Sequence, residues 1–454
     1  MHPSSLESMQ KCYRRFFLPS TLASQGLVRV LDIGGADVNG SYREVFAGPQ
    51  FDYRTADLSP GPGVDLVLTD PYRIPLPDGS IDIVLSGQML EHCEFFWLAF
   101  QEMARLLSPD GFLFLIAPSA GPIHRYPVDC YRFYPDAYAA LAKYAGCHLQ
   151  AVWRDERGPW QDLVGVFRRH EPPSHAAPVP GSVVALPAPA PIDSRPEEEG
   201  IAGQSDYLEV LRLAHQALAP RLYLEIGIRH GRSLALAEGP AIGIDPAPEI
   251  REPLGAETQV VSATSDDFFD LQAETTTSGP IDLAFIDGMH LFEYALRDWM
   301  QVERRAAPAG LVVIDDIYPN HPRQALRERA TRVWTGDVWR LHALLAAERP
   351  DLFLLPLDTS PTGLLLIAGL DPGNRVLWDR YNPLVRHYRG GLPAEPPPEV
   401  LGRRGALAPD DPLVAELLAL LRGLRDSGAG VAAVRAALAS LRERLAQSLN
   451  QECL

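Results

Sequence analysis

The sequence predicts an α/β protein with mostly parallel sheets, and the clearest observation is a strand–helix–strand pattern in residues 281–321. Two short apolar runs, Leu283–Ile286 and Leu311–Ile314, flank a helical run over Phe292–Ala307. Apolar runs this short are typical of buried strands. A strand, helix and strand of this length form a βαβ unit with parallel neighbours, so both strands end at the same edge of the sheet.

The second observation is that this pattern occurs twice. The interval from Asp82 to Gly111 is 29 residues, and the corresponding interval from Asp282 to Gly310 is 28. A repeat on this scale indicates two domains of one fold and not a solenoid. A length of 454 residues also fits two domains with additional segments.

Composition restricts the class of protein. The apolar content of 46% supports large cores, and the net charge of −17 argues against non-specific nucleic-acid binding. Five scattered cysteines with no C-x-x-C pair fit a reducing compartment and no structural zinc. We find no signal-peptide core in the first 20 residues and no apolar run of about 18 residues, so we expect a cytoplasmic protein without a membrane span.

The first half begins with a polar segment and a short amphipathic helix. A strand over Val28–Ile33 then contains Asp32 and leads into Gly34 and Gly35. The glycines let the backbone approach a ligand at the mouth of a following helix. Asp57 ends the next strand, 25 residues after Asp32, where an acid can hold ribose hydroxyls. The G-x-G-x-x-G fingerprint is absent, which argues against an NAD-linked enzyme.

The strands and helices continue in a definite order. We predict strands at Asp65–Asp70, Ile81–Leu85, SPDGFLFLIAP, HLQAVWRDE and DLVGVFRR, with a helix over Phe95–Leu107. Four segments follow one another in a characteristic order: LDIGGADVNG, ADL, TDPYRIPLPDGSIDIV and SGQMLEH. Because of these segments, residues 28–170 resemble class I S-adenosylmethionine-dependent methyltransferases. The resemblance implies a Rossmann-like domain with a seven-stranded sheet. It also implies a cofactor site in which Gly34 and Gly35 contact the methionine part, Asp57 holds the ribose and Asp70 lies near adenine, with Asp32 in the same site.

A loop of polar and aromatic residues follows the fifth strand. Its notable side chains are His124, Arg125, Tyr126, Asp129, Tyr131 and Arg132. Such a mixture suits a hydroxylated or anionic acceptor, and it equally suits a packed aromatic lid.

Residues 171–200 are rich in Pro and Ala and have no helical or strand period, which predicts a semi-extended linker between domains. In the second half, a strand over Tyr223–Ile226 contains Glu225 and is followed by Gly227 and Gly231. Asp245 lies 20 residues after Glu225. These four residues repeat the predicted cofactor site of the first half.

Acids follow two strands of the second half: Asp287 after the first, and Asp315 and Asp316 after the second, with His290 close by. We interpret these acids as a ligand-binding site at the carboxyl edge of the sheet, where open α/β sheets bind ligands. The alternative interpretation is that they cap helices or face solvent. The second half contains the segments YLEIGIRHGRSL and FIDGMHLFEYALRDW. Because of these segments, residues 200–385 resemble metal-dependent O-methyltransferases, including catechol and sugar O-methyltransferases. The resemblance implies that the three aspartates hold Mg²⁺.

One position departs from that family. Some sugar enzymes carry a presumed general base two residues after the first ligand, and Met289 stands there in this chain. Either His290 takes the role or the base comes from elsewhere.

We predict domains at 1–170 and 201–390, a linker at 171–200 and a helical tail at 391–454 that packs on a domain or forms a dimer contact. We predict S-adenosylmethionine-dependent O-methylation of a hydroxylated small molecule or glycan, with Mg²⁺ in the second domain. The alternative is that one half is a non-catalytic cofactor-binding or scaffolding domain.

Overall fold

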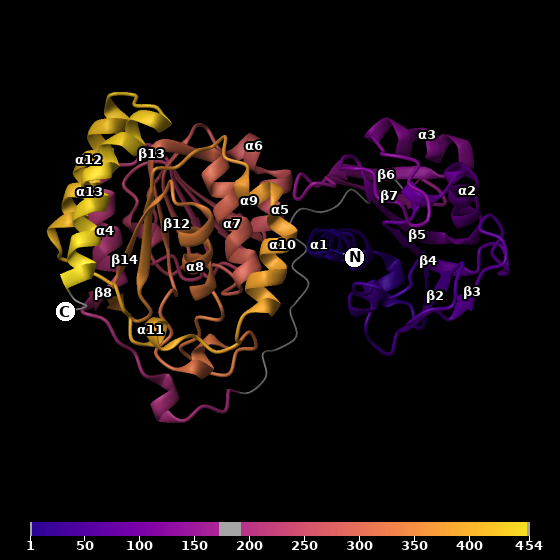
Figure 1. Cartoon of the computed structure of the whole chain (residues 1–454), viewed down its shortest axis with the longest axis horizontal. Helices are drawn as coiled ribbons and strands as arrows, with labels where there is room; N and C mark the ends of the chain where they lie inside the picture. Colours follow the sequence, from indigo (N-terminus) through magenta and orange to yellow (C-terminus); the bar gives the residue numbers. More distant parts are fainter. Residues whose placement is uncertain (1, 172–191, 452–454) are drawn as a thin grey trace. The chain divides into compact units, whose positions relative to one another are not determined.

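The computed structural model describes residues 2–171 and 192–451, which divide into two compact units. Unit 1 contains residues 1–184 together with Trp378–Pro383, and unit 2 contains the remainder of the chain (Figure 1). None of the helices in the described ranges is long and apolar enough to cross a bilayer.

Unit 1 is built on a seven-stranded sheet in the order β3-β2-β1-β4-β5-β7-β6. All neighbouring strands are parallel except β7, which is antiparallel to both β5 and β6. The strands are β1 (Val28–Ile33), β2 (Phe51–Asp57), β3 (Leu66–Val67), β4 (Ile81–Gly87), β5 (Leu107–Pro118), β6 (His148–Arg154) and β7 (Asp162–Arg168). The helices are α1 (Pro3–Cys12), α2 (Phe96–Leu106) and α3 (Pro135–Ala145).

Both faces of this sheet are covered, as the alternation along β5 shows. Leu113 and Leu115 point into one apolar cluster that includes residues of α2 and α3. Phe112 and Phe114 point into a second cluster that includes residues of α1. Because successive side chains of a strand point to opposite faces, a continuous apolar run predicts burial on both sides.

Unit 2 repeats the architecture in the order β11-β10-β9-β12-β13-β16-β14. Its strands are β9 (Tyr223–Ile226), β10 (Ala241–Asp245), β11 (Thr258–Ser262), β12 (Ile281–Ile286), β13 (Ala306–Ile314), β14 (Phe353–Leu357) and the antiparallel β16 (Leu364–Ala368). A separate two-stranded sheet joins β8 (Ser205–Asp206) to β15 (Thr359–Ser360). Its helices are α4 (Tyr207–Leu218), α5 (Ser265–Leu271), α6 (Ala273–Thr276), α7 (Phe292–Arg305), α8 (Trp339–Glu348), α11 (Pro398–Leu401), α12 (Pro412–Asp426) and α13 (Val431–Gln451). Two short helices, α9 (Val376–Asp379) and α10 (Tyr381–Val385), contain residues assigned to each unit. The predicted fold class is confirmed for both halves.

The strand register of unit 2 places the predicted site. Ile286 of β12 pairs with Ile226 of β9 on one side and with Ile314 of β13 on the other. The three strands therefore end level with one another, and the residues that follow them meet at one edge of the sheet.

The C-terminal helices complete the core of unit 2. Of the two yellow helices in Figure 1, α12 packs against α4, and α13 packs against α12. Leu417 of α12 and Leu438 of α13 are fully buried in the same cluster as Val313 of the sheet. The predicted tail is thus part of a domain. A dimer contact through these helices stays a prediction, and it would have to use their other faces.

Two expectations are wrong in detail. We expected a helix after the glycine loop of the first half, but only a 3₁₀ turn stands there, at Tyr42–Glu44; the second half likewise has a 3₁₀ turn, at Leu234–Leu236. The last part of the predicted linker is not extended: Pro196–Glu199 forms a 3₁₀ turn, and the buried Glu198 carboxylate lies 2.6 Å from Arg323. Of the predicted linker, residues 172–191 lie outside the described residues.

Candidate functional site

The end of the second strand in each unit carries an aspartate that organises the glycine loop. The Asp245 carboxylate accepts hydrogen bonds from the backbone N–H of Arg229 (2.9 Å) and of Ala247 (2.8 Å). In unit 1, Asp57 accepts from Ala36 (3.3 Å) and Ser59 (3.4 Å). In both units the carboxylate joins its own loop to the glycine loop. Each oxygen has a second lone pair, so the same group can also accept from ribose hydroxyls.

The acids inside the first strands, Asp32 and Glu225, lie deeper. Asp32 accepts from the hydroxyl of Tyr53 at 2.7 Å, and burial raises the pKa of Asp32 to about 6. Glu225 accepts from Tyr223 at 2.8 Å and from Ser233 at 2.5 Å, and burial raises its pKa to about 7. Both residues are at most 2% exposed, which favours a role in holding the loop over direct contact with a ligand.

The glycines predicted in the site are required by the backbone. Gly34, Gly227 and Gly231 have φ values of +77°, +92° and +80°. A Cβ on Gly35 would lie 2.7 Å from Asp32 Cγ, so this glycine lets the loop pass over the buried acid. Asp70, by contrast, is exposed, and its carboxylate accepts from the backbone N–H of Tyr72.

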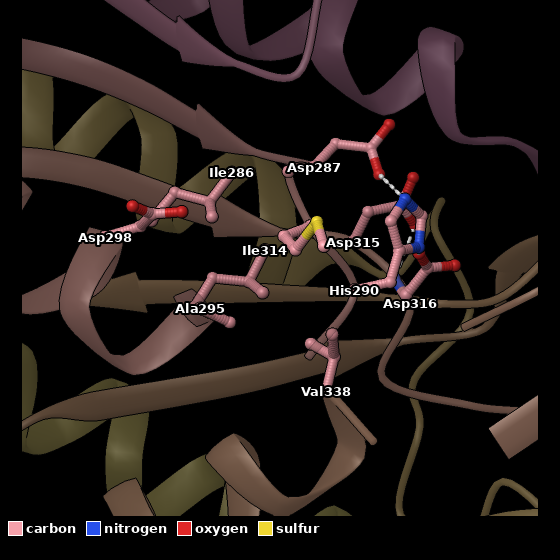
Figure 2. A pocket seen from close by; sticks show the side chains of 11 residues that line it. Ile286, Asp287, His290, Ala295, Asp298, Ile314, Asp315, Asp316 and Val338 are labelled. Atoms are coloured by element: carbon pink, nitrogen blue, oxygen red, sulfur yellow. Dashed lines mark hydrogen bonds and ion pairs between the residues drawn. The ribbon is translucent and has the colours of Figure 1, made fainter. Parts of the chain in front are cut away.

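The residues after β12 and β13 form a compact cluster of acids around a histidine (Figure 2). His290 Nδ1 is closely paired with Asp316 Oδ2, and His290 Nε2 lies 3.7 Å from Asp287 Oδ1. Ligand atoms of these three residues all lie within 4.8 Å of one another. Asp315 is turned differently: its Oδ1 accepts from the backbone N–H of Asp316 and from the Thr362 hydroxyl.

The electrostatics of this cluster are unfavourable without a counter-charge. Burial, then the neighbouring charge of Asp316, raises the pKa of Asp315 to about 8. Burial and the carboxylates of Asp315 and Asp316 raise the pKa of Asp287 well above its usual range. Burial lowers the pKa of His290, but the carboxylates of Asp316 and Asp315 outweigh it and the net shift is upward. Carboxylates this close repel one another, and a cation removes that conflict.

The backbone around His290 is specialised. His290 and Asp316 have φ values of +54° and +65°, a region that non-glycine residues seldom occupy and that occurs often at functional sites. The His290 ring is stacked on Trp334 with centroids 5.2 Å apart. The cluster opens into a pocket whose lining includes Asp287, His290, Ala295, Asp298, Asp315, Asp316 and Val338. Oxygen ligands of this kind fit Mg²⁺ or Mn²⁺.

Unit 1 has a cluster in the equivalent place that the sequence reasoning missed. Glu91 and His92 follow β4, His124 follows β5, and ligand atoms of the three residues also lie within 4.8 Å of one another. The signal was present in the sequence: an acid and a histidine follow the fourth strand in both halves.

The loop after β5 is ordered by its own polar contacts. Arg132 donates to both oxygens of Asp129, at 2.6 and 2.8 Å, and the Tyr131 hydroxyl donates to the Glu94 carbonyl. Arg125 and Tyr126 are exposed. Part of the loop is therefore packed and part is exposed, and acceptor binding by its residues stays a prediction.

Comparisons with known proteins find a methyltransferase domain in each unit. Two family models, both described as a methyltransferase domain, match residues 41–115 and 224–317. No curated protein matches the chain. Similar solved structures include a putative methyltransferase from Bacillus halodurans (22% identity, TM-score 0.24, 30% of this chain and 69% of that one). They also include a methyltransferase from Archaeoglobus fulgidus that depends on S-adenosylmethionine (16%, 0.28, 36% and 94%). A third is the Burkholderia thailandensis 1,6-didemethyltoxoflavin-N1-methyltransferase with bound S-adenosylhomocysteine (17%, 0.27, 37% and 85%).

Proposed function

We propose that the second domain methylates a hydroxyl group of a small molecule or glycan. The proposal starts from the two class I S-adenosylmethionine-dependent methyltransferase domains that the chain carries. The observation that carries this proposal is the cluster of Asp287, His290 and Asp316 at the carboxyl ends of β12 and β13. It combines oxygen ligands for a cation with an imidazole that can hold a proton. Open α/β sheets bind their ligands at this edge.

The donor side of the site is formed by the glycine loop and Asp245. Bound S-adenosylmethionine supplies the electrophilic methyl group. Asp245 would hold the ribose while its carboxylate keeps the loop of Arg229 in place. Methyl transfer is an in-line displacement, so the main contribution of the protein is to align donor and acceptor.

On the acceptor side, Asp287 and Asp316 would hold a divalent cation, and Asp315, whose Oδ1 accepts from Asp316 N–H and Thr362, would join them through Oδ2. Such a cation lowers the pKa of a bound hydroxyl and orients it. His290 is the base that we assign: Asp316 accepts the proton on Nδ1, so the Nε2 lone pair of the neutral ring accepts the acceptor's proton, and the same carboxylate stabilises the imidazolium that forms. The exposed Met289 next to it cannot accept a proton.

The test is turnover of the full chain with S-adenosylmethionine and a panel of acceptors: a catechol, a polyol and a nucleotide sugar. Product is measured by mass spectrometry, with and without chelator. We expect chelator and Asp316→Asn each to abolish methylation, Mg²⁺ to restore it in the wild type only, and His290→Ala to lower turnover while the cation still binds. Glu257→Gln is the matched control, because this exposed acid precedes β11 at the opposite edge of the sheet. Full activity in chelator and in Asp316→Asn would refute the role of the cluster.

Calorimetry separates the two donor sites. We expect two molecules of S-adenosylmethionine to bind per chain, with Asp57→Asn weakening one site and Asp245→Asn the other. A single site, unaffected by Asp57→Asn, would contradict cofactor binding by the first domain.

A further inference from the structure

We propose that Glu91, His92 and His124 of the first unit form a three-ligand site for a zinc-like divalent cation. This site is separate from the acidic cluster of the second unit. All three residues lie just beyond β4 and β5, at the same sheet edge as the glycine loop of unit 1.

The first argument is the state of Glu91. Its side chain is 0% exposed, and neither carboxylate oxygen has a hydrogen-bond partner. A buried carboxylate without a partner is costly, and burial raises the pKa of Glu91 to about 8. Buried charges in proteins are normally paired or coordinate a metal, and the neighbouring atoms here are imidazole nitrogens.

The second argument is the orientation of the His92 ring. His92 Nδ1 lies 2.5 Å from the carbonyl oxygen of Val128, which can only accept, so Nδ1 carries the proton. His92 Nε2 then has its lone pair free, and it lies 3.6 Å from Glu91 Oε1. A metal-bound histidine typically has its second nitrogen held by an oxygen in this manner.

His124 completes the set, but its ring is held differently. Its Nδ1 accepts a hydrogen bond from the Arg132 guanidinium at 3.4 Å and lies equally far from Asp129 Oδ2, while its Nε2 lies 4.0 Å from Glu91 Oε1. Ligation through Nε2 requires the tautomer in which Nδ1–H donates to Asp129. Arg132 donates to both oxygens of Asp129, so its charge is neutralised there, and Glu91, beside the two imidazoles, has no hydrogen-bond partner among the described residues.

The geometry and the ligand types favour zinc. Zinc–ligand bonds of about 2.1 Å in a tetrahedron place ligand atoms about 3.4 Å apart, so the observed separations of 3.6 and 4.0 Å need shifts of less than 1 Å. Two histidines and one glutamate form a ligand set of catalytic zinc sites, which keep a fourth position for water or substrate. Mg²⁺ prefers oxygen ligands and fits the second unit better.

The backbone holds the three ligands together. The carbonyl of Glu91 accepts from the backbone N–H of Cys130 at 2.7 Å and of Tyr131 at 3.3 Å, which fastens the loop after β5 to the turn after β4. The His124 ring also packs against Trp160 with centroids 4.4 Å apart. The site is thus built from two segments that are already joined, and a cation would not need to assemble them.

The experiment is a Zn²⁺ titration of the metal-stripped full chain in competition with a chromophoric chelator. Co²⁺ absorption spectra report the ligand geometry. We expect His92→Ala/His124→Ala to bind one equivalent fewer than the wild type and to lose the Co²⁺ spectrum. Glu91→Gln should weaken the site at least tenfold, and Asp129→Asn, which removes the partner of His124, should weaken it about 10- to 100-fold.

Two controls locate the ion. Asp287→Asn alters only the second unit and should keep the first-unit equivalent, and the exposed His170→Ala should match the wild type. Equal stoichiometry and affinity in the wild type and in the double alanine variant would overturn the proposal. If that variant does not fold, Glu91→Gln decides, since it removes a charge without changing the shape of the side chain: unchanged affinity refutes the site.

Discussion

Gly227→Ala tests whether the glycine loop and the acidic cluster of the second unit are one structure. A Cβ on Gly227 would lie 1.9 Å from the carbonyl oxygen of Asp287, whereas real Cβ contacts essentially never fall below 3.0 Å. The backbone must therefore move by about 1.1 Å, the difference between these distances. That movement separates the end of β9 from the end of β12. We expect S-adenosylmethionine binding and turnover each to fall at least tenfold.

Gly231→Ala is the matched control. Both glycines have positive φ, so both substitutions should cost about 1–2 kcal/mol of stability for the left-handed backbone. The nearest atom to a Cβ at Gly231 is a flexible side-chain carbon of Ile250, at 3.3 Å, so no backbone needs to move. We expect Gly227→Ala to cost about 1–3 kcal/mol more, the usual range for overpacking, in denaturant unfolding of the second unit. Equal losses of stability and affinity in the two variants would refute the reasoning.

Three further predictions concern stability. Burial holds the pKa of Glu225 at about 7 in the folded protein, above its unfolded value, so its contribution to folding stability is present at low pH and is lost as pH rises through about 7. The free energy of unfolding of the wild type should therefore fall by about 1 kcal/mol relative to Glu225→Gln between pH 6 and 8. Parallel pH profiles of the two proteins would contradict this. Leu417→Ala should cost about 2–5 kcal/mol in unfolding experiments while the partly buried Leu420→Ala costs less, and equal values would argue against the packing of α12 in the core. Arg349→Ala leaves the buried Glu303 without its bidentate partner and should lower the free energy of unfolding by about 3–5 kcal/mol. The double variant Glu303→Gln/Arg349→Met should recover part of this loss, because it leaves no unpaired charge buried. No recovery would show that the charges matter little.

The fold was predictable because its strands are short, nearly uniform apolar runs, and such runs are typical of buried strands. The strands Val28–Ile33 and Tyr223–Ile226 were predicted with the bounds that the structure has. The order of acids and glycines around them then located the cofactor loops. What periodicity could not supply was the local geometry: the segment after Gly35, where we expected a helix, forms only a 3₁₀ turn, and so does the segment after Gly231.

The candidate sites were predictable to the extent that strand order determines them. Asp287 and Asp316 were found because parallel neighbouring strands end at one edge. The different orientation of Asp315 depends on a hydrogen bond from Thr362, which lies 47 residues away in the sequence. The same limit applies to unit 1, where the role of His124 depends on a loop whose path no local pattern determines.

Comparison of the two units gives a physical reason to regard both clusters as functional. Each places buried acid beside histidine after its fourth and fifth strands, and in each the acid is unfavourable there: Glu91 has no hydrogen-bond partner, and Asp315 lies beside another carboxylate. Natural sequences depart from the rules of packing mainly at functional sites. The loops that would hold the donor have the same design in both units, with Asp57 and Asp245 in equivalent positions. The clusters differ in ligand type, nitrogen-rich in one and oxygen-rich in the other, so the difference between the units lies on the acceptor side of the sheet edge.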